Sequence, residues 1–312
     1  MEKNLIISKL KSEIGKKVIG QENMIDKILI GILTEGHILL EGLPGLAKSL
    51  TVNTIAETLG LKFSRIQFTP DLLPSDIIGT EFYNEKTGEF YTKKGPIFAN
   101  IILADEINRA PAKVQSALLE AMQERQVTIS NETFLLERPF IVLATQNPIE
   151  QNGTYPLPEA QQDRFLMKVK VDYPTKDEEK KFLELIAGEN DFENIEITKI
   201  LTKKNLDELK SQVKKVYIDE KLKEYILNII FKTREKSNDI LCGASPRASI
   251  ALVKASKANA FIEGRDFVMP SDIKKVIYDV LRHRIILSYE AYANEKTVDE
   301  IIMEVIESVE LP

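Results

Sequence analysis

A glycine-containing loop is the first group of residues whose types and spacing could carry chemistry. Residues 42 to 49 spell Gly-Leu-Pro-Gly-Leu-Ala-Lys-Ser and lie between a short apolar run and an amphipathic stretch. Such a loop turns backbone N–H groups toward a polyphosphate, while a lysine reaches the outer phosphates and a hydroxyl binds Mg2+. Lys48 and Ser49 supply those two groups, although Ala47 stands where the bare pattern has its second glycine. A Gly-Pro turn before a helix is the alternative, and the order strand, loop, helix favours a phosphate-binding loop.

Two carboxylates follow another apolar run. The residues 101 to 104 can be buried in a strand, and Asp105 and Glu106 come directly after them. Ligands bind at the carboxyl edge of a parallel sheet. There one carboxylate can organise Mg2+ and its waters, and a second can orient or deprotonate an attacking water. Alone, the pair is equally typical of a helix N-cap with a first-turn Glu, and the phosphate loop on a neighbouring strand favours Asp105 for the metal and Glu106 for the water.

A neutral amide follows the next strand. In Ala-Thr-Gln-Asn-Pro, Asn147 comes to the same edge of the sheet, where it could hold the water or sense the γ-phosphate. By itself an Asn-Pro pair indicates a turn. The interpretation of Asn147 therefore depends on the two motifs beside it.

Three arginines are candidates for contact with nucleotide phosphates. Arg247 comes two residues after a natural N-cap, Ser245, and a cation in a first turn opposes the helix dipole by roughly a few tenths of a kcal/mol. A broken local rule of this kind often marks function. Arg164 directly precedes the last predicted strand and could reach the γ-phosphate of a neighbouring subunit, with Arg109 a weaker candidate for the same interface. The alternative is a solvated surface arginine, paired with Asp163 in the case of Arg164.

The elements that must position these residues form an alternating α/β pattern. Short runs rich in Ile, Leu, Val and Phe are typical of parallel strands buried on both faces. The sequence predicts five strands: Ile38 to Glu41, Lys62 to Gln67, Ile101 to Asp105, Ile141 to Thr145 and Phe165 to Val171. Helices are predicted over Lys48 to Leu59, ended by Gly60, and over Ala112 to Arg125.

The pattern changes after Tyr173, and no convincing strand follows. Thr175 and Glu178 have the spacing of a capping box, Leu222 to Ile230 carry a helical apolar stripe, and Pro270 opens a further helix. We therefore predict a nucleotide-binding core over residues 1–174 and an all-helical domain over 175–312.

Two segments inside the predicted core have hairpin character. Residues 81–92 place two aromatic-rich strands around the turn Asn84 to Gly88, and residues 126–135 place two short strands around Ser130 to Glu132. Two surface hairpins are the simplest interpretation.

Composition bounds the function. The chain has 312 residues with net charge −6, which disfavours nucleic acid as a partner. Cys242 is the only cysteine and His37 and His283 the only histidines, so an intrachain disulfide and His- or Cys-built metal sites are excluded. The charged N-terminus and the absence of a long apolar run predict neither export nor a membrane span. We expect a cytoplasmic protein.

Five motifs in order over about residues 15 to 290 resemble the MoxR family of AAA+ ATPases. They are Gly42 to Ser49, Leu103 to Pro111, Ala144 to Pro148, Asp163 to Phe165 and Gly243 to Arg247. In that family alanine or glycine is usual where Ala47 stands. The resemblance implies a five-stranded AAA+ P-loop core followed by a helical lid domain. It also implies a ring, in all expectation a hexamer, in which the two hairpins project toward the pore and act on client proteins.

The resemblance also implies roles for individual residues. The catalytic set is Glu106, Lys48, Asn147 as sensor 1, Arg164 as arginine finger and Arg247 as sensor 2. The ATP-binding set is Val18, Ile19, Gly20, Gln21, Gly42, Leu43, Pro44, Gly45, Leu46, Ala47, Lys48, Ser49, Leu50, Asp105 and Arg247, of which residues 18 to 21 line the adenine pocket. Ser49 and Asp105 hold Mg2+, partly through water.

The sequence thus predicts a Mg2+-dependent ATPase that remodels, activates or helps to mature a partner protein, for which a von Willebrand factor A domain protein is a candidate. Two alternatives remain. One is a helicase-like DNA motor, which the net charge disfavours. The other is a nucleotide-gated scaffold with incidental turnover. A GTPase is disfavoured because the chain lacks an Asn-Lys-x-Asp sequence.

Overall fold

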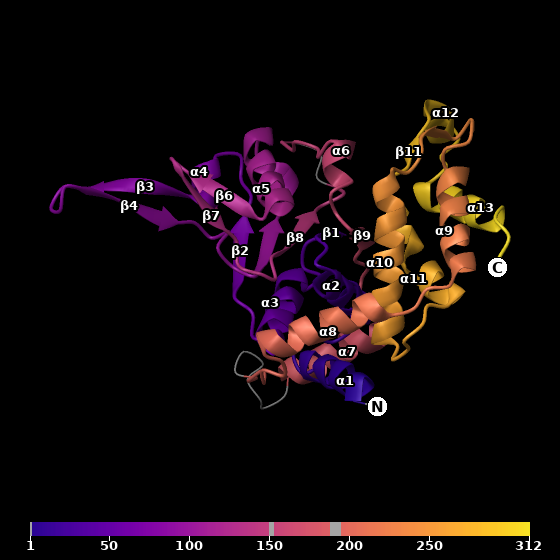
Figure 1. The fold of residues 1–312 in the computed structure, drawn as a ribbon, viewed down its shortest axis with the longest axis horizontal. Coiled ribbons are helices and arrows are strands. Elements are labelled where there is room, and N and C mark those ends of the chain that lie inside the picture. The colour runs from indigo at the N-terminus through magenta and orange to yellow at the C-terminus, as the bar shows by residue number, and fades with distance from the viewer. Residues whose placement is uncertain (1, 150–152, 188–194) are drawn as a thin grey trace.

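A five-stranded parallel sheet forms the centre of the N-terminal half (Figure 1). The computed structural model describes residues 2–149, 153–187 and 195–312. The strand order is β2-β5-β8-β1-β9, and every neighbouring pair is parallel. The strands are β1 (Ile38–Glu41), β2 (Phe63–Gln67), β5 (Ile101–Asp105), β8 (Ile141–Gln146) and β9 (Met167–Lys170). All five predicted strands are confirmed, with β9 shorter at both ends than the apolar run that predicted it.

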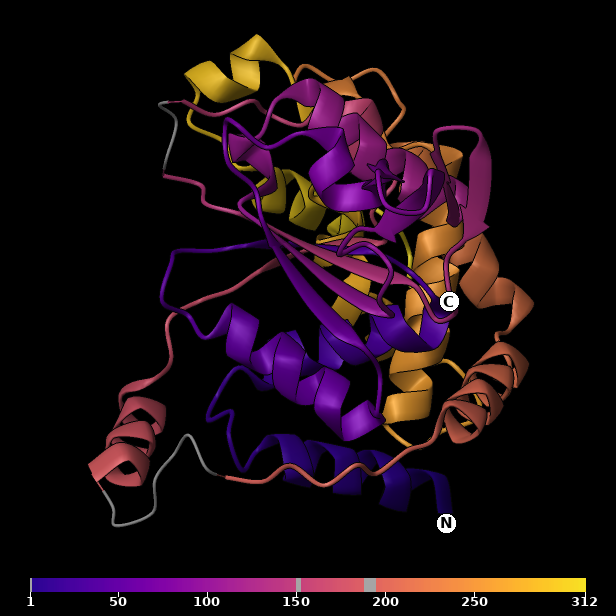
Figure 2. The ribbon, with the colours of Figure 1, turned by 90° about the vertical axis from the view of Figure 1, so that its left-hand side faces the viewer.

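Helices cover both faces of this sheet (Figure 2). Alternate residues of the inner strands enter different hydrophobic clusters: in β5, Leu103 lies in one cluster and Ile102 in the other. The helices of this half are α1 (Glu2–Ile14), α2 (Glu22–Thr34), α3 (Lys48–Leu59), α4 (Pro74–Ile78), the 3-10 turn η1 (Ile107–Arg109), α5 (Ala112–Glu124) and α6 (Glu159–Gln162). Helix α5 stops one residue before the predicted end because Arg125 adopts a left-handed conformation, φ 54°.

The C-terminal half is helical, as predicted. Its elements are α7 (Lys176–Ala187), α8 (Lys203–Lys215), α9 (Glu220–Lys232), β10 (Ile240–Cys242), α10 (Pro246–Ile262), α11 (Pro270–Leu281), β11 (Ile286–Leu287), α12 (Tyr289–Ala293) and α13 (Val298–Glu307). The capping box of Thr175 and Glu178 forms. The antiparallel pair β10–β11 corrects the all-helical prediction, because runs of two and three residues show no alternation to recognise. No helix in the described ranges is long and apolar enough to cross a membrane.

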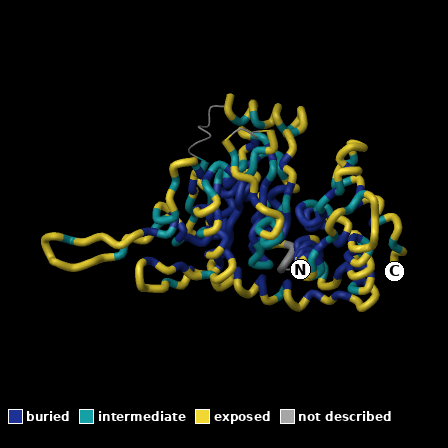
Figure 3. The backbone as a smooth tube through the Cα atoms, turned by 90° about the horizontal axis from the view of Figure 1, so that it is seen from above, coloured by how far each residue is buried: buried dark blue, intermediate teal, exposed yellow. Residues whose placement is uncertain are grey.

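Both predicted hairpins form. The first pairs β3 (Gly79–Asn84) with β4 (Glu89–Lys94), and the second pairs β6 (Gln126–Ile129) with β7 (Glu132–Leu135). The β3–β4 hairpin extends away from the body as a long arm (Figure 1), and almost all of it is exposed (Figure 3). Each hairpin is therefore an excursion from the sheet that leaves the strand order unchanged.

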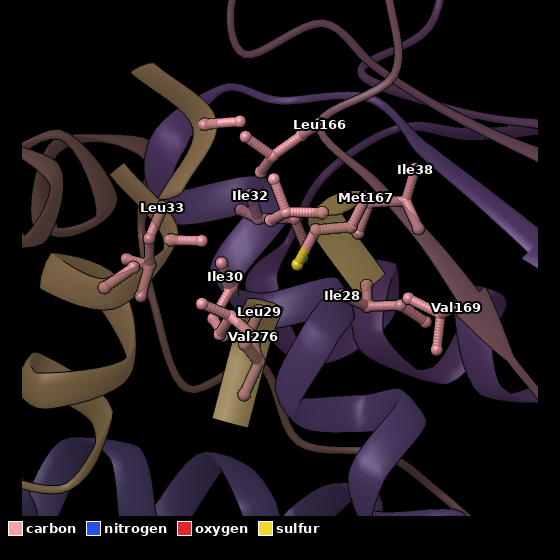
Figure 4. Packing of buried hydrophobic residues seen from close by; sticks show 14 of the residues in the cluster. Ile28, Leu29, Ile30, Ile32, Leu33, Ile38, Leu166, Met167, Val169 and Val276 are labelled. Carbon is pink, nitrogen blue, oxygen red and sulfur yellow. The ribbon is translucent and has the colours of Figure 1, made fainter. Parts of the chain in front are cut away.

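Helix α2 joins the two halves of the molecule. Most of its residues are buried, and one hydrophobic cluster runs from β1 and β9 through α2 to residues of α10 and α11 (Figure 4). Lys27 on α2 forms an ion pair of 2.8 Å with Asp279 on α11, and both side chains are largely buried. The two halves therefore share a core, although the chain passes between them near residue 174, where the domain boundary stays a prediction.

The buried residue His37 ties three elements together just before β1. The backbone N–H of Val142 donates to its Nδ1 at 3.0 Å, so Nε2 carries the proton and donates to the carbonyl of Met122 at 3.1 Å. A second proton on the ring would remove the acceptor of Val142. Burial accordingly lowers the pKa of His37 to about 4, against an ordinary 6.5.

The pH dependence of folding tests this arrangement. Below pH 6.5 the unfolded chain protonates His37 and the folded chain does not, so stability is complete above pH 6.5 and falls as the pH drops toward 4. The total loss from this group is about 3 kcal/mol. Urea unfolding of wild type and His37→Gln at pH 7 and pH 4.5 measures it, because all other groups titrate in both proteins. We expect a shallower loss in the variant, and equal losses would contradict the assignment.

Candidate functional site

The glycine-containing loop turns the chain from β1 into the N-terminus of α3. Gly42 lies so close to the Val171 carbonyl that a Cβ would come within 2.7 Å of that oxygen. Gly45 has φ 83° and Ala47 φ 53°, and the left-handed region costs a non-glycine residue roughly 1 kcal/mol or more. Helix α3 then begins at Lys48. The first N–H groups of this helix thus border the loop, as a phosphate-binding loop requires.

A pocket of about 350 Å3 lies between this loop and the carboxyl ends of the neighbouring strands. It brings together most of the residues that the sequence singled out and three others that it did not. The predicted lining residues are Gly42, Pro44, Gly45, Leu46, Ala47, Lys48, Ser49, Leu50, Asp105, Glu106 and Asn147, and the additional ones are Arg65, Gln67 and Thr145. Leu43, also predicted, packs against the hydrophobic core instead.

Lys48 is held inside the loop that precedes it. Its Nζ donates to the Gly42 carbonyl at 2.7 Å. Partial burial lowers the pKa of Lys48, an effect that the carboxylates of Asp105 and Glu106 oppose. The poorly solvated ammonium group of Lys48 can bind an anionic ligand. A cation that accompanies this ligand offsets the negative charge of the two nearby carboxylates.

Asp105 has partners on both carboxylate oxygens. Thr145 donates its hydroxyl to Oδ1 at 2.6 Å, and Arg65 donates to Oδ2 from Nη2 at 2.5 Å and from Nε at 3.1 Å. A guanidinium thus lies where the sequence predicts a metal. Oxygen donors from Ser49 and Asp105 are the ligand types that Mg2+ takes, usually with several waters and the phosphates of its substrate. The residues present therefore fit Mg2+.

Glu106 is held in a defined orientation. It has φ 57°, and its backbone N–H donates to the Thr145 hydroxyl at 2.8 Å. Its Oε2 accepts from Gln67 Nε2 at 2.8 Å and lies 3.1 Å from Arg109 Nε. Arg109, predicted as a weaker candidate for an interface, is thus paired with Glu106 of its own chain.

The residues that sequence reasoning missed left a weak signal. Arg65 and Gln67 are two residues apart at the end of a strand, a spacing that places both side chains on one face. Thr145 ends the predicted fourth strand. Asn147 lines the pocket, and its Oδ1 also accepts from the Ile149 N–H at 3.2 Å, so the Asn-Pro turn is present together with the site.

The predicted adenine-binding residues border a second cavity. Val18, Ile19 and Gly20 line a space of about 450 Å3, whereas Gln21 donates from Nε2 to the carbonyl of Asp172 at 2.9 Å. Val171, the residue before Asp172, touches Gly42 of the loop. Gln21 and Gly42 thus both contact the chain just after β9.

Arg164 and Arg247 do not lie in the pocket of the phosphate loop. They line a third cavity, of about 250 Å3, together with Gly36 and His37. Gly36 and His37 precede β1, and Arg164 precedes β9. Because the strands are parallel, this cavity lies at the amino edge of the sheet and the loop at its carboxyl edge. The chain does not bring either arginine to its own phosphate loop.

Comparisons with known proteins agree with this geometry. Residues 37–167 match the ATPase family associated with various cellular activities (AAA), and residues 233–305 match the AAA lid domain. The chain is 46% identical to the chaperone MoxR1 of Mycobacterium tuberculosis, over 96% of this chain and 81% of that protein. The chain belongs to the MoxR family of AAA+ ATPases.

A second MoxR protein and a solved structure extend the comparison. The MoxR protein of Methylorubrum extorquens is 30% identical over 98% of this chain and 95% of its own. A crystal structure from Cytophaga hutchinsonii superposes with a TM-score of 0.92 at 51% identity, covering 100% of this chain and 96% of that one. The likeness to this solved structure therefore covers the whole chain, including the hairpin arm and the lid.

Thr145 is a test of how the two carboxylates are held. Thr145→Val keeps the shape of the side chain but leaves the Glu106 N–H without its acceptor, so we expect the free energy of unfolding to fall by about 1 to 3 kcal/mol. In Thr128→Val, the matched control, the lost hydroxyl contacts only Thr133 on an exposed hairpin, and the change should stay within about 0.5 kcal/mol. Chemical denaturation measures both, and equal losses would refute the interpretation.

Proposed function

We propose that this MoxR protein hydrolyses ATP with Mg2+ at sites shared between adjacent copies in a ring, and that hydrolysis drives the remodelling or activation of a partner protein. The observation that carries the proposal is that the phosphate pocket and the two arginines lie at opposite edges of the sheet. Loop, lysine and carboxylates lie at the carboxyl edge of the sheet, and Arg164 and Arg247 lie at the amino edge. A ring of identical copies lets the amino edge of one copy face the carboxyl edge of the next.

The loop binds and orients the nucleotide. Backbone N–H groups of residues 45 to 49 and the N-terminus of α3 receive the phosphates, and Lys48 exchanges the Gly42 carbonyl for a phosphate oxygen. Ser49 and Asp105 are the groups that would hold Mg2+, which when bound neutralises charge on the phosphates. Arg65 must then leave Asp105 Oδ2. Val18, Ile19 and Gly20, which line a second cavity, are proposed to enclose the base.

Glu106 is the residue for the attacking water. Its carboxylate is aimed by Gln67 and Arg109 on one side and by its own backbone bond to Thr145 on the other. An ionised carboxylate within hydrogen-bond reach of a water can orient it and accept its proton. Asn147 lines the same pocket and is placed to hold the other side of that water.

The arginines complete the site from a neighbouring copy. Charge builds on the γ-phosphate oxygens during transfer, and an arginine supplied in trans is worth about 10³ to 10⁵ in rate where it has been dissected. Arg164 is proposed for this contact and Arg247 for sensing the nucleotide from the lid. A hexamer is the expectation from the family resemblance.

Mutant mixtures test the shared site. Glu106→Gln should bind ATP and lose turnover, because it keeps the loop and loses the base. Arg164→Ala should do the same, because it loses the trans cation. Mixed in equal amounts, the two variants form interfaces with an intact pocket on one side and an intact arginine on the other.

Recovery of turnover in the mixture is the expected result, measured as phosphate release per chain. Lys48→Ala mixed with Arg164→Ala is a second complementing pair, whereas Lys48→Ala mixed with Glu106→Gln is the matched control that should stay inactive. Wild-type turnover in Glu106→Gln alone, or no recovery with Arg164→Ala, would contradict the proposal.

The β3–β4 arm is proposed as the part that engages the partner protein. Its aromatic side chains Phe82, Tyr83, Phe90 and Tyr91 are 42%, 55%, 66% and 52% exposed. They form the cross-strand pairs Phe82–Tyr91 and Tyr83–Phe90, on opposite faces of the ribbon. Apolar surface on both faces of a projecting arm marks a binding element. A partner with a von Willebrand factor A domain and a cytoplasmic location are further parts of the proposal, supported by the resemblance and by the single cysteine.

Serine substitutions test the arm. In Phe82→Ser with Phe90→Ser we expect ATP affinity and melting temperature to stay unchanged, because both rings are exposed. Stimulation of turnover by an unfolded probe, reduced and carboxymethylated α-lactalbumin, should be lost. Leu241→Ser, at an apolar residue of the lid that is about as exposed as Phe90, is the matched control and should respond as wild type does. Full stimulation of the arm variant would refute this role.

A further inference from the structure

The cavity that holds Arg164 and Arg247 contains a nearly buried ion pair. Asp163, the residue before Arg164, accepts at Oδ1 from Arg284 Nε at 2.8 Å. The Arg284 side chain is 2% exposed and that of Asp163 19%. Arg284 comes from the segment after α11 of the lid, so the pair joins the lid to the amino edge of the sheet.

Arg284 also binds the backbone on both sides of Arg164. Its Nη2 donates to the carbonyl of Asp163 at 3.2 Å and to that of Phe165 at 2.6 Å. Its Nη1 donates to the carbonyl of Leu166 at 3.1 Å. Burial lowers the pKa of Arg284, and the neighbouring Asp163 carboxylate opposes that change. The lid therefore holds the backbone of Arg164 in place through one guanidinium.

The same carboxylate also holds the start of α10. Ser245 donates its hydroxyl to both oxygens of Asp163, at 3.0 and 2.9 Å. That hydroxyl in turn accepts from the backbone N–H of Arg247 at 3.2 Å, and Arg247 Nε lies 4.0 Å from Asp163 Oδ2. One side chain thus contacts the elements that carry both proposed trans arginines.

We propose that Asp163 is a positioning residue that sets Arg164 and Arg247 as a single unit, so that both reach the nucleotide of a neighbouring copy together. This inference rests on the proposed shared site. Asp163 itself touches no nucleotide in this account. It acts through Arg284, which fixes the backbone around Arg164, and through Ser245, which fixes the first turn of α10.

A rigid unit has a mechanical consequence. Rotation of the lid cannot carry Arg247 away while Arg164 stays behind, because Arg284 and Ser245 both belong to the lid and both bond to Asp163. The orientation of the lid in one copy therefore determines whether both arginines reach the ATP site of the next copy.

The test is whether Asp163→Asn recovers turnover when it is mixed with each of the other two variants. This substitution keeps the size of the side chain and removes its charge. Its own pocket is intact, so ATP affinity should stay within about twofold of wild type. Turnover should fall by about 100-fold, the loss expected for a group misplaced by about 1 Å. Mixed with Glu106→Gln it should recover turnover, and mixed with Arg164→Ala it should not. The exposed Asp177→Asn is the matched control and should keep wild-type turnover.

Each outcome decides between defined alternatives. A merely structural role predicts no recovery with either partner, and wild-type turnover or recovery with Arg164→Ala would also overturn the inference.

A second variant serves if thermal unfolding shows that Asp163→Asn does not fold. Ser245→Ala then removes only the link between Asp163 and the start of α10. Ser245→Ala should lower kcat with KM unchanged and fall in the same group, and unchanged kcat would overturn the inference. If Arg164→Ala and Glu106→Gln themselves fail to complement, the shared site is refuted, and this inference with it.

Discussion

Because its strands are all parallel, the central sheet has one edge where strands begin and another where they end. The residues of the proposed site are distributed over these two edges. Every strand end that carries a residue of the phosphate pocket lies at the carboxyl edge, beside the loop that follows β1. Arg164 comes before β9 and so emerges at the amino edge. A strand of four residues such as β1 separates the edges by roughly 13 Å at about 3.3 Å per residue. A single copy therefore holds a phosphate pocket without its proposed trans cations, and those cations without a phosphate.

The shared core gives the amino edge its rigidity. Helix α2 is buried between the sheet and the lid, and the residues that follow α11 bond to the backbone around Arg164. Arg282 adds a bond to the carbonyl of Lys168 at 2.9 Å. The pocket edge, by contrast, ends in exposed side chains such as Arg65, which can exchange partners when a ligand enters. Rigid presentation at one edge and adaptable capture at the other suit a site assembled from two copies.

Much of the pocket could be predicted from the sequence because its residues directly follow apolar runs. Asp105 ends a strand, Asn147 directly follows one, and the loop that leads to Lys48 begins directly after one. Strand ends can be recognised from the hydrophobic pattern. Arg65 and Gln67 could not be recognised in the same way, since they belong to the least apolar strand of the five-stranded sheet and carry no motif. The sequence predicts Thr145 as the end of a strand, which is correct. Its hydroxyl group, which bonds to the Asp105 carboxylate and to the backbone N–H of Glu106, leaves no signal in the pattern.

The lid and the arginines show a different limit. Helical stripes and caps identified α7, α9 and α11, but β10 and β11 are too short to leave a pattern. The sequence singles out Arg164 by its place before the last strand and Arg247 by its place in the first turn of a helix, and only the fold brings the two into one cavity. Asp163 is a plain acidic residue in the sequence. Its contacts to Arg284 and Ser245 join residues that are far apart in the chain, which no local pattern records.

The central claim is that one copy cannot complete its own ATP site. Specific ATPase activity measured over a wide range of protein concentration, with sedimentation velocity on the same samples, tests this directly. The account predicts that turnover per chain rises in proportion to the assembled fraction and vanishes for the monomer. Turnover per chain that stays constant while the monomer predominates would contradict it, because the pocket would then work without the arginines of a neighbour.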